Sequence, residues 1–196
     1  FWDTEAGCGV YNQPLDYDQL SAALDSVACN HSAMMSDLLD NPLFRNYFIN
    51  RYADIMNTIF IPDSMVQHLN YFRDLLFQDM PRQIQRWDSS GTYTFAQWLA
   101  NTDTLTAYVY NRPPYAREIV RNYFGLNEVV DVTLATNPPD AGKIKISTIT
   151  PEPLPWTGKY FDGNPVTLTA TTNPGFIFSH WETLQSSYIP SNIISL

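Results

Sequence analysis

The first residues of the chain carry side chains that can bind a metal ion. Asp3 and Glu5 stand two positions apart, directly before the glycine-containing stretch Ala6–Gly9. In an extended backbone, side chains at i and i+2 point to one face, so the two carboxylates converge. Mg²⁺ is usually held by one or two carboxylates while substrate phosphates supply further oxygen ligands. The spacing therefore predicts a Mg²⁺ site for phosphoryl transfer, with capping of the following turn as the alternative.

Apolar residues at three-to-four spacing predict helices in the part of the chain before residue 128. Asn41 is expected to cap a helix that opens at Pro42. We expect the apolar stripe of this helix to be core rather than a ligand groove. The stripe consists of Phe44, Tyr47, Phe48, Tyr52, Ile55, Met56, Ile59 and Phe60.

Prolines and caps predict where the other helices begin and end. A helix is expected to restart at Pro62, and Pro81 to kink or divide the segment that runs to Trp87. Thr94 is expected to cap a further helix. After Pro113–Pro114 we expect a separate last helix that stops at Gly125. Asp16 and Asp18 precede an earlier helix, where capping is the better explanation for two acids.

Beyond residue 128 the apolar residues alternate with period two, which is typical of strands. Strands are expected near 130–134, 144–146, 166–170 and 176–178, and another begins at 193–196. Proline and glycine turns separate them. The sequence therefore predicts an α+β chain: a helical lobe at 1–127, followed by a small and incomplete antiparallel β-module at 128–196. Such a short module has a thin core, so it should lean on the helices or on a neighbour.

Composition limits the partners that the chain can have. The net charge of −9 argues against a nucleic-acid surface, which needs clustered Lys and Arg. No run approaches the roughly 20 apolar residues of a membrane span. Cys8 and Cys29 are compatible with one disulfide or with two buried free thiols. Arg51 and Arg86 could bind phosphate, but pairing with Asp54 or Asp88, or stacking on a ring, fits them better.

Five short motifs, in this order, resemble the C-terminal half of CotH-type proteins. The motifs are Trp2–Glu5 with Gly9, Leu38–Pro42 with Phe44, Arg51–Thr58, Met80–Trp87 and Asn111–Pro113. CotH-type proteins are secreted or spore-coat proteins with an atypical protein-kinase-like fold, and some members phosphorylate proteins. Four further segments resemble β-repeats that follow CotH domains in multidomain secreted bacterial proteins. They are Gly142–Ile144, Trp156–Gly163, Val166–Ala170 and Pro174–Trp181.

The resemblance implies roles for residues and cofactors. Asp3 matches the Mg²⁺-binding acid that plays the part of the kinase DFG aspartate. Glu5 stands where the family usually has a second Asp, and its extra methylene moves the carboxylate oxygens. Mg²⁺ and ATP are the cofactors implied. The nucleotide-binding Lys and the catalytic Asp of the family lie upstream of this segment, so the segment alone is expected to be inactive as a kinase.

Two functions follow as hypotheses. The first is the C-terminal portion of a secreted CotH-type kinase-like protein, extracellular or on a bacterial cell surface, acting on a protein substrate and joined to further domains. The second is a non-catalytic surface module for adhesion, glycan binding or assembly. For the second, four aromatic residues of the β-module could form a sugar platform, although packing of a small core explains them better. They are Trp156, Tyr160, Phe161 and Trp181.

Overall fold

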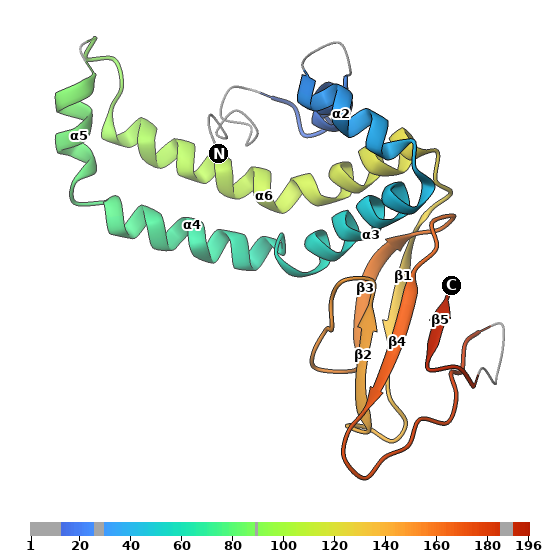
Figure 1. Cartoon of the computed structure of the whole chain (residues 1–196). Helices are drawn as coiled ribbons and strands as arrows, with labels where there is room; N and C mark the ends of the chain where they lie inside the picture. The colour runs from blue at the N-terminus through green and yellow to red at the C-terminus, as the bar shows by residue number, and fades with distance from the viewer. Residues whose placement is uncertain (1–12, 26–29, 89, 185–189) are drawn as a thin grey trace. The chain divides into compact units, whose positions relative to one another are not determined.

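A computed structural model describes residues 13–25, 30–88, 90–184 and 190–196 of the chain. Across these ranges, six helices are followed by five strands in two small antiparallel sheets, which confirms the α+β class (Figure 1). The helices are α1 (Gln19–Leu24), α2 (Asn30–Leu39), α3 (Pro42–Thr58), α4 (Pro62–Leu76), α5 (Met80–Trp87) and α6 (Phe95–Phe124). No helix within those ranges is long and apolar enough to cross a membrane.

Local caps set the helix ends that the sequence predicts. Asn41 Oδ1 accepts the backbone N–H of Leu43 at 2.9 Å and that of Phe44 at 3.3 Å, directly before α3. At α6, Thr94 Oγ1 accepts the N–H of Gln97 at 3.2 Å, while Gln97 Oε1 accepts the N–H of Thr94 at 2.6 Å. This reciprocal pair is a capping box. Both predicted caps are confirmed.

Helix α6 is one helix of 30 residues with Pro113 and Pro114 inside it. The expected break at these prolines is therefore wrong. Each proline removes one backbone donor of the helix, but the next two turns bury Ala116 and Val120. That burial offsets the lost hydrogen bonds, so tertiary packing overrides the local preference. Gly125, at φ 63°, ends the helix as predicted.

The strands form two separate ladders. β1 (Val129–Leu134) pairs with β3 (Trp156–Phe161), whereas β4 (Thr167–Thr172) lies between β2 (Gly142–Ile146) and β5 (Ile193–Ser195). The sequence missed β3, whose interior Gly158 interrupts the apolar alternation. It also wrongly predicted a strand at 176–178, which is irregular and leaves Ile177 94% exposed. The β4 edge is instead paired by β5.

The chain folds as two compact units, each built from two separate stretches of sequence. Unit 1 comprises residues 1–22 and 58–119, and unit 2 comprises 23–57 and 120–196. Unit 2 thus joins α3 to the strands, which confirms that the thin β-module leans on a helix. The border at 127 and 128, as a border between domains, stays a prediction.

The buried face of α3 differs from the predicted apolar stripe. Of that stripe only Met56 is buried, while Tyr47, Ile59 and Phe60 are exposed. The other buried residues of the helix are Ile49, Asn50, Ala53 and Asp54. The stripe prediction was wrong because the strands of unit 2 accept polar side chains from α3.

Candidate functional site

The predicted metal ligands Asp3 and Glu5 lie outside the described residues, as do Cys8 and Cys29. Within the part of the chain that the structure describes, no group of three or more His, Cys, Asp or Glu side chains could hold a metal ion. The Mg²⁺ site stays a prediction that depends on Asp3 and Glu5.

Arg112 holds the segment that follows these acids. Its guanidinium donates to the carbonyl oxygen of Leu15 through Nη1 and, at 2.8 Å, to that of Tyr17 through Nη2. The guanidinium also lies 6.0 Å from the centroid of the Tyr108 ring. A planar fork suits such a double contact better than an ammonium does. Ten residue steps separate Glu5 from Leu15 and can span about 35 Å, so the Arg112 contacts do not place the acidic motif.

Asp18 acts as a cap, as predicted. Its Oδ1 accepts the N–H of Ser21 at 2.9 Å, and its Oδ2 accepts the Ser21 hydroxyl at 2.6 Å. Both bonds lie at the start of α1, where an acid also opposes the positive end of the helix dipole. Both oxygens of the Asp18 carboxylate are thus engaged by Ser21 in capping the helix.

The most strongly built polar cluster lies between α3 and the strands of unit 2, around Asp54. This carboxylate is 0% exposed. Its Oδ2 accepts the backbone N–H of Thr148 at 2.9 Å and the Thr148 hydroxyl at 2.7 Å, and its Oδ1 accepts the Tyr160 hydroxyl at 2.7 Å. Arg51 Nη1 donates to Thr148 Oγ1 at 2.9 Å. Arg51 and Asp54 are therefore linked through Thr148, and the phosphate role of Arg51 gains no support.

The Tyr160 side chain is a permanent proton donor in this cluster. Burial raises its pKa above the ordinary value of a tyrosine, and the hydrogen bond to Asp54 and the negative charge of that residue raise it further. Only 1% of Tyr160 is exposed, so a neutral hydroxyl stays paired with a buried carboxylate. The residue is core, as expected for the module aromatics, and the same holds for the buried Phe161. Neither can serve as a sugar platform.

Asparagines extend the polar face of α3 on both sides of Asp54. Asn50 Nδ2 donates to the Pro165 carbonyl at 2.7 Å, and Asn50 Oδ1 accepts from Asn164 Nδ2 at 2.8 Å. Asn57 binds both backbone groups of Lys159, donating to its carbonyl at 2.9 Å and accepting its N–H at 3.0 Å. These hydrogen bonds hold the strands against α3. Because the Asp54 carboxylate is fully buried, this polar face stabilises the fold and does not present the carboxylate to a substrate.

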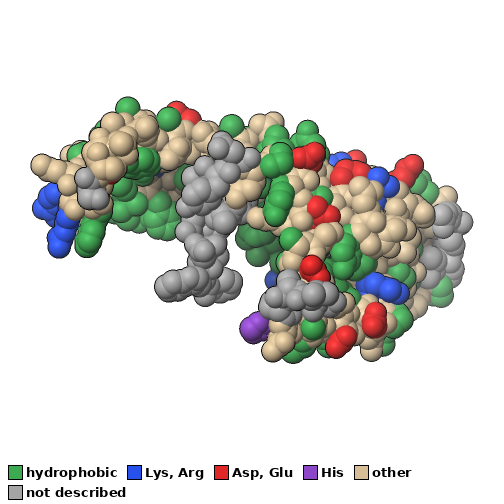
Figure 2. Space-filling model, turned by 90° about the horizontal axis from the view of Figure 1, so that it is seen from above, with side chains coloured by type: hydrophobic (Ala, Val, Ile, Leu, Met, Phe, Trp, Pro, Cys, Tyr) green, Lys and Arg blue, Asp and Glu red, His purple; other side chains and the backbone are tan. Residues whose placement is uncertain are grey.

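Arg86 stacks on a ring, which was one of the two interpretations favoured for it. Its guanidinium carbon lies 5.1 Å from the centroid of the Trp87 ring. Trp87 Nε1 donates to Gln83 Oε1 at 3.1 Å on the same helix, α5. Basic side chains lie beside apolar ones at this end of the helical part (Figure 2). Because Trp87 is 72% exposed, this is a surface arrangement.

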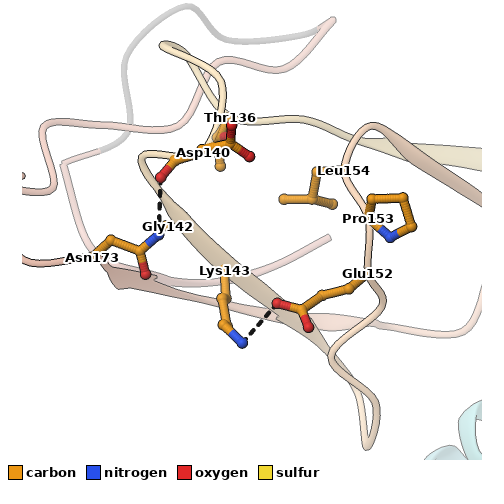
Figure 3. A pocket seen from close by; sticks show the side chains of 8 residues that line it. All are labelled: Thr136, Asp140, Gly142, Lys143, Glu152, Pro153, Leu154 and Asn173. Atoms are coloured by element: carbon orange, nitrogen blue, oxygen red, sulfur yellow. Dashed lines mark hydrogen bonds and ion pairs between the residues drawn. The ribbon is translucent and has the colours of Figure 1, made fainter.

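A polar pocket of about 350 Å³ lies where β2 begins and β4 ends (Figure 3). Asn173 Nδ2 donates to the Asp140 carbonyl oxygen at 2.8 Å, and Lys143 Nζ lies 2.7 Å from Glu152 Oε1. Asp140 adopts a positive φ of 62°, which Asp tolerates in turns. Thr136 and Leu154 also line the pocket. Lys143 and Glu152 pair with each other, and no aromatic ring lines the pocket, so it lacks a stacking surface for sugars.

Comparison with known proteins decides the family. The model of the CotH kinase protein family matches residues 1–116, more than half of the chain. The chain belongs to the CotH kinase protein family. No curated protein and no solved structure matches it.

Membership of the CotH family makes this a kinase-like chain and confirms the resemblance drawn from the short motifs. The matched range includes Asp3, Glu5, Arg51 and Arg112, and it ends before β1. The strands are therefore outside the match, and their likeness to bacterial β-repeats stays a prediction.

Sequence reasoning missed the partners that hold this CotH chain together. Arg112 stood within a recognised motif but had no role assigned to it. Asn50, Asp54 and Asn57 follow one another at spacings of four and three, which place them on one helical face. This polar periodicity was a usable signal, whereas nothing local indicates Thr148 as the shared partner.

Proposed function

We propose that this chain supplies Asp3 and Glu5 as Mg²⁺-binding acids to a site for ATP-dependent transfer of phosphate to proteins. The observation that carries the proposal is the family match over residues 1–116, a range that includes both acids. Their spacing adds support, because two carboxylates at i and i+2 converge in an extended segment. Asp3 takes the role of the principal ligand and Glu5 that of a second one.

The remaining parts of the site, a nucleotide-binding Lys and a catalytic Asp, are proposed to come from sequence upstream of residue 1. A bound Mg²⁺ neutralises charge on the transferred phosphoryl group. Carboxylate oxygens are its preferred protein ligands. Within the described residues no group of three or more His, Cys, Asp or Glu side chains could hold a metal ion, so no step of the transfer is assigned to them. The proposed setting is outside the cell or on a bacterial surface, as the family resemblance implies.

The test uses the protein with its upstream sequence and measures Mg²⁺-dependent turnover of ATP and transfer of labelled phosphate to protein. Asp3→Asn is expected to lower turnover at least tenfold, because an amide cannot replace an anionic ligand. Glu5→Gln is expected to cause a smaller loss. Asp16→Asn serves as the matched control, since Asp16 is exposed and close in sequence.

Three outcomes are decisive. Unchanged turnover in Asp3→Asn would remove the role assigned to this residue. An equal loss of turnover in Asp16→Asn would show that the negative charge of the segment matters, and not a specific Mg²⁺ ligand at Asp3. A protein with intact fold and no response to Mg²⁺ and ATP would favour the non-catalytic surface module.

A further inference from the structure

Helices α4 and α6 lie side by side in unit 1, and α5 joins them at one end (Figure 1). The Tyr110 hydroxyl of α6 donates to Asp63 Oδ1 of α4 at 2.9 Å. Towards the other end of the pair, the Phe77 ring lies 5.1 Å from the Phe95 ring, edge to face. The three helices therefore form one layer, in which one side of α4 is turned to α6.

This helical layer buries almost no apolar side chain. In the described part of unit 1, which is 13–22, 58–88 and 90–119, Ala116 is the one apolar residue that is buried. Unit 2, in contrast, has an apolar core to which both α3 and the strands contribute. A helix that carries an apolar stripe must bury it against another element, and domains need two packed layers to do so. The described part of unit 1 is one such layer.

The side of α4 that is turned away from α6 carries a run of exposed apolar side chains. Phe72 is 55% exposed and Leu75 is 61% exposed, and Tyr71 and Leu76 are exposed as well. Ile61, also exposed, lies three turns before Phe72 on the same side of the helix. We call these five residues the α4 face. A contiguous exposed apolar patch of this kind marks a surface that another protein segment covers.

The chain reaches this layer from its N-terminal side. Arg112 of α6 donates to the carbonyl oxygens of Leu15 and Tyr17, so the first described residues are held on the layer to which α4 belongs. The CotH match over residues 1–116 contains α4 and α5 completely, so the α4 face belongs to the kinase-like part of the chain. A segment that precedes these residues is covalently joined to the layer. Its effective concentration there exceeds that of a separate partner.

We propose that the segment upstream of residue 1 packs apolar side chains on the α4 face and supplies the second layer of unit 1. This inference rests on the proposed function, in which that segment carries the nucleotide-binding Lys and the catalytic Asp. Burial of apolar surface provides the free energy for the contact. Docking on α4 therefore holds the upstream segment in place without bound Mg²⁺ or ATP.

The first test is hydroxyl-radical footprinting, read by mass spectrometry, on two unaltered proteins without Mg²⁺ and ATP. One protein consists of residues 1–196, and the other carries the upstream sequence in addition. Oxidation of Phe72, Leu75 and Leu76 is expected to be slower by roughly fivefold or more in the longer protein, because close packing excludes water from these side chains. Ile177 of unit 2, which is 94% exposed, is the internal control and should react equally in both proteins.

Three other results would each overturn the proposal. Fast oxidation of the α4 face in both proteins would show that the upstream segment leaves it uncovered. Slow oxidation in both would show that another part of residues 1–196 covers it. Protection that increases with protein concentration would assign the face to a second copy of the chain. The role of Asp3 is tested separately by turnover, so failure of the docking and failure of the proposed function are distinguishable.

A pair of variants on α4 tests the same contact through stability. Phe72→Asp places a charge on the α4 face, whereas Gln67→Asp places the same charge at an exposed position about 140° away round the helix. Phe72→Asp is expected to lower the urea midpoint of the longer protein by about 1 M or more, because the buried charge has no partner. Gln67→Asp should leave that midpoint unchanged, and neither variant should change the midpoint of residues 1–196. Equal midpoints of the two variants in the longer protein would refute the proposal.

Discussion

Helix α3 in unit 2 differs from helices α4 and α5 in unit 1 in what it buries. Helix α3 buries Asn50 and Asp54 against the strands through direct hydrogen bonds. Helices α4 and α5 have no buried residue in the described chain and expose large side chains such as Phe72 and Trp87. The number of apolar residues in a helix therefore does not show which face is buried. In α3 the buried face is determined by polar side chains that bind partners in the strands.

The largest loss of stability is expected on substitution of Asp54, the buried carboxylate of α3. Asp54→Ala leaves the buried Tyr160 hydroxyl and the two part-buried donors of Thr148 without their acceptor. Unfolding free energy should fall by about 3–5 kcal/mol, because three donors, one of them fully buried, lose a charged partner together. Urea denaturation followed by circular dichroism measures the change.

Asp74→Ala on α4 is the matched control for Asp54→Ala. Asp74 is exposed and pairs with its neighbour Arg73 at 2.8 Å. Its loss should change the unfolding free energy by less than about 0.5 kcal/mol, since exposed ion pairs contribute little. If the two variants lose equal stability, α3 and α4 do not differ in the way described.

Tyr160→Phe should have the next largest effect. It removes the donor to Asp54 Oδ1 and should cost about 1–3 kcal/mol of unfolding free energy. It also tests a pH dependence. The raised pKa of Tyr160 means that, above about pH 10, the unfolded chain binds fewer protons at this residue than the folded chain does.

The stability of the natural chain should therefore decline as the pH rises above about 10, and this contribution should be complete below that pH. The decline should be smaller in Tyr160→Phe, which cannot ionise. Parallel urea titrations of both proteins between neutral pH and about pH 11 measure the difference. Identical slopes would show that the Tyr160 hydroxyl does not couple to folding.

Arg112→Ala tests the tether of unit 1. Residues 15–17 lose both guanidinium contacts to their carbonyl oxygens, so they should be cleaved several-fold faster in limited proteolysis. Arg112→Lys should restore only part of the protection, because an ammonium lacks the planar fork. Unchanged cleavage in Arg112→Ala would show that other contacts hold the segment.

The smallest effect is expected at Trp87 on α5. Its side chain is largely exposed and contacts Gln83 and Arg86 of the same helix. Trp87→Ala should lower the unfolding free energy by less than about 0.5 kcal/mol, as is usual for surface positions. A loss close to that of Tyr160→Phe would mean that α5 packs far more tightly than its exposure indicates.

Much of the fold is predictable because many helix ends are local events. Asn41 and Thr94 act through backbone groups within three residues, so their caps can be identified from sequence. Gly125 ends α6 because it adopts a positive φ that other residues rarely tolerate. The α+β class and the CotH resemblance also follow from sequence patterns.

The candidate site was less predictable. Asp3 and Glu5 were identified from spacing and resemblance, and their role stays a prediction. The Arg112 contacts to Leu15 and Tyr17 join residues far apart in the chain, so no local pattern could indicate them. The continuity of α6 through Pro113 likewise depends on burial of the turns that follow.

By itself the sequence determined the family, the α+β class and the helix caps, because these depend on residue order and on contacts within a few positions. Only the tertiary structure decided which face of α3 is buried and how the strands pair. These features depend on partners such as Thr148, Tyr160 and Lys159, which lie about a hundred residues from α3. Such pairings form only when distant segments meet, and burial then makes their hydrogen bonds obligatory.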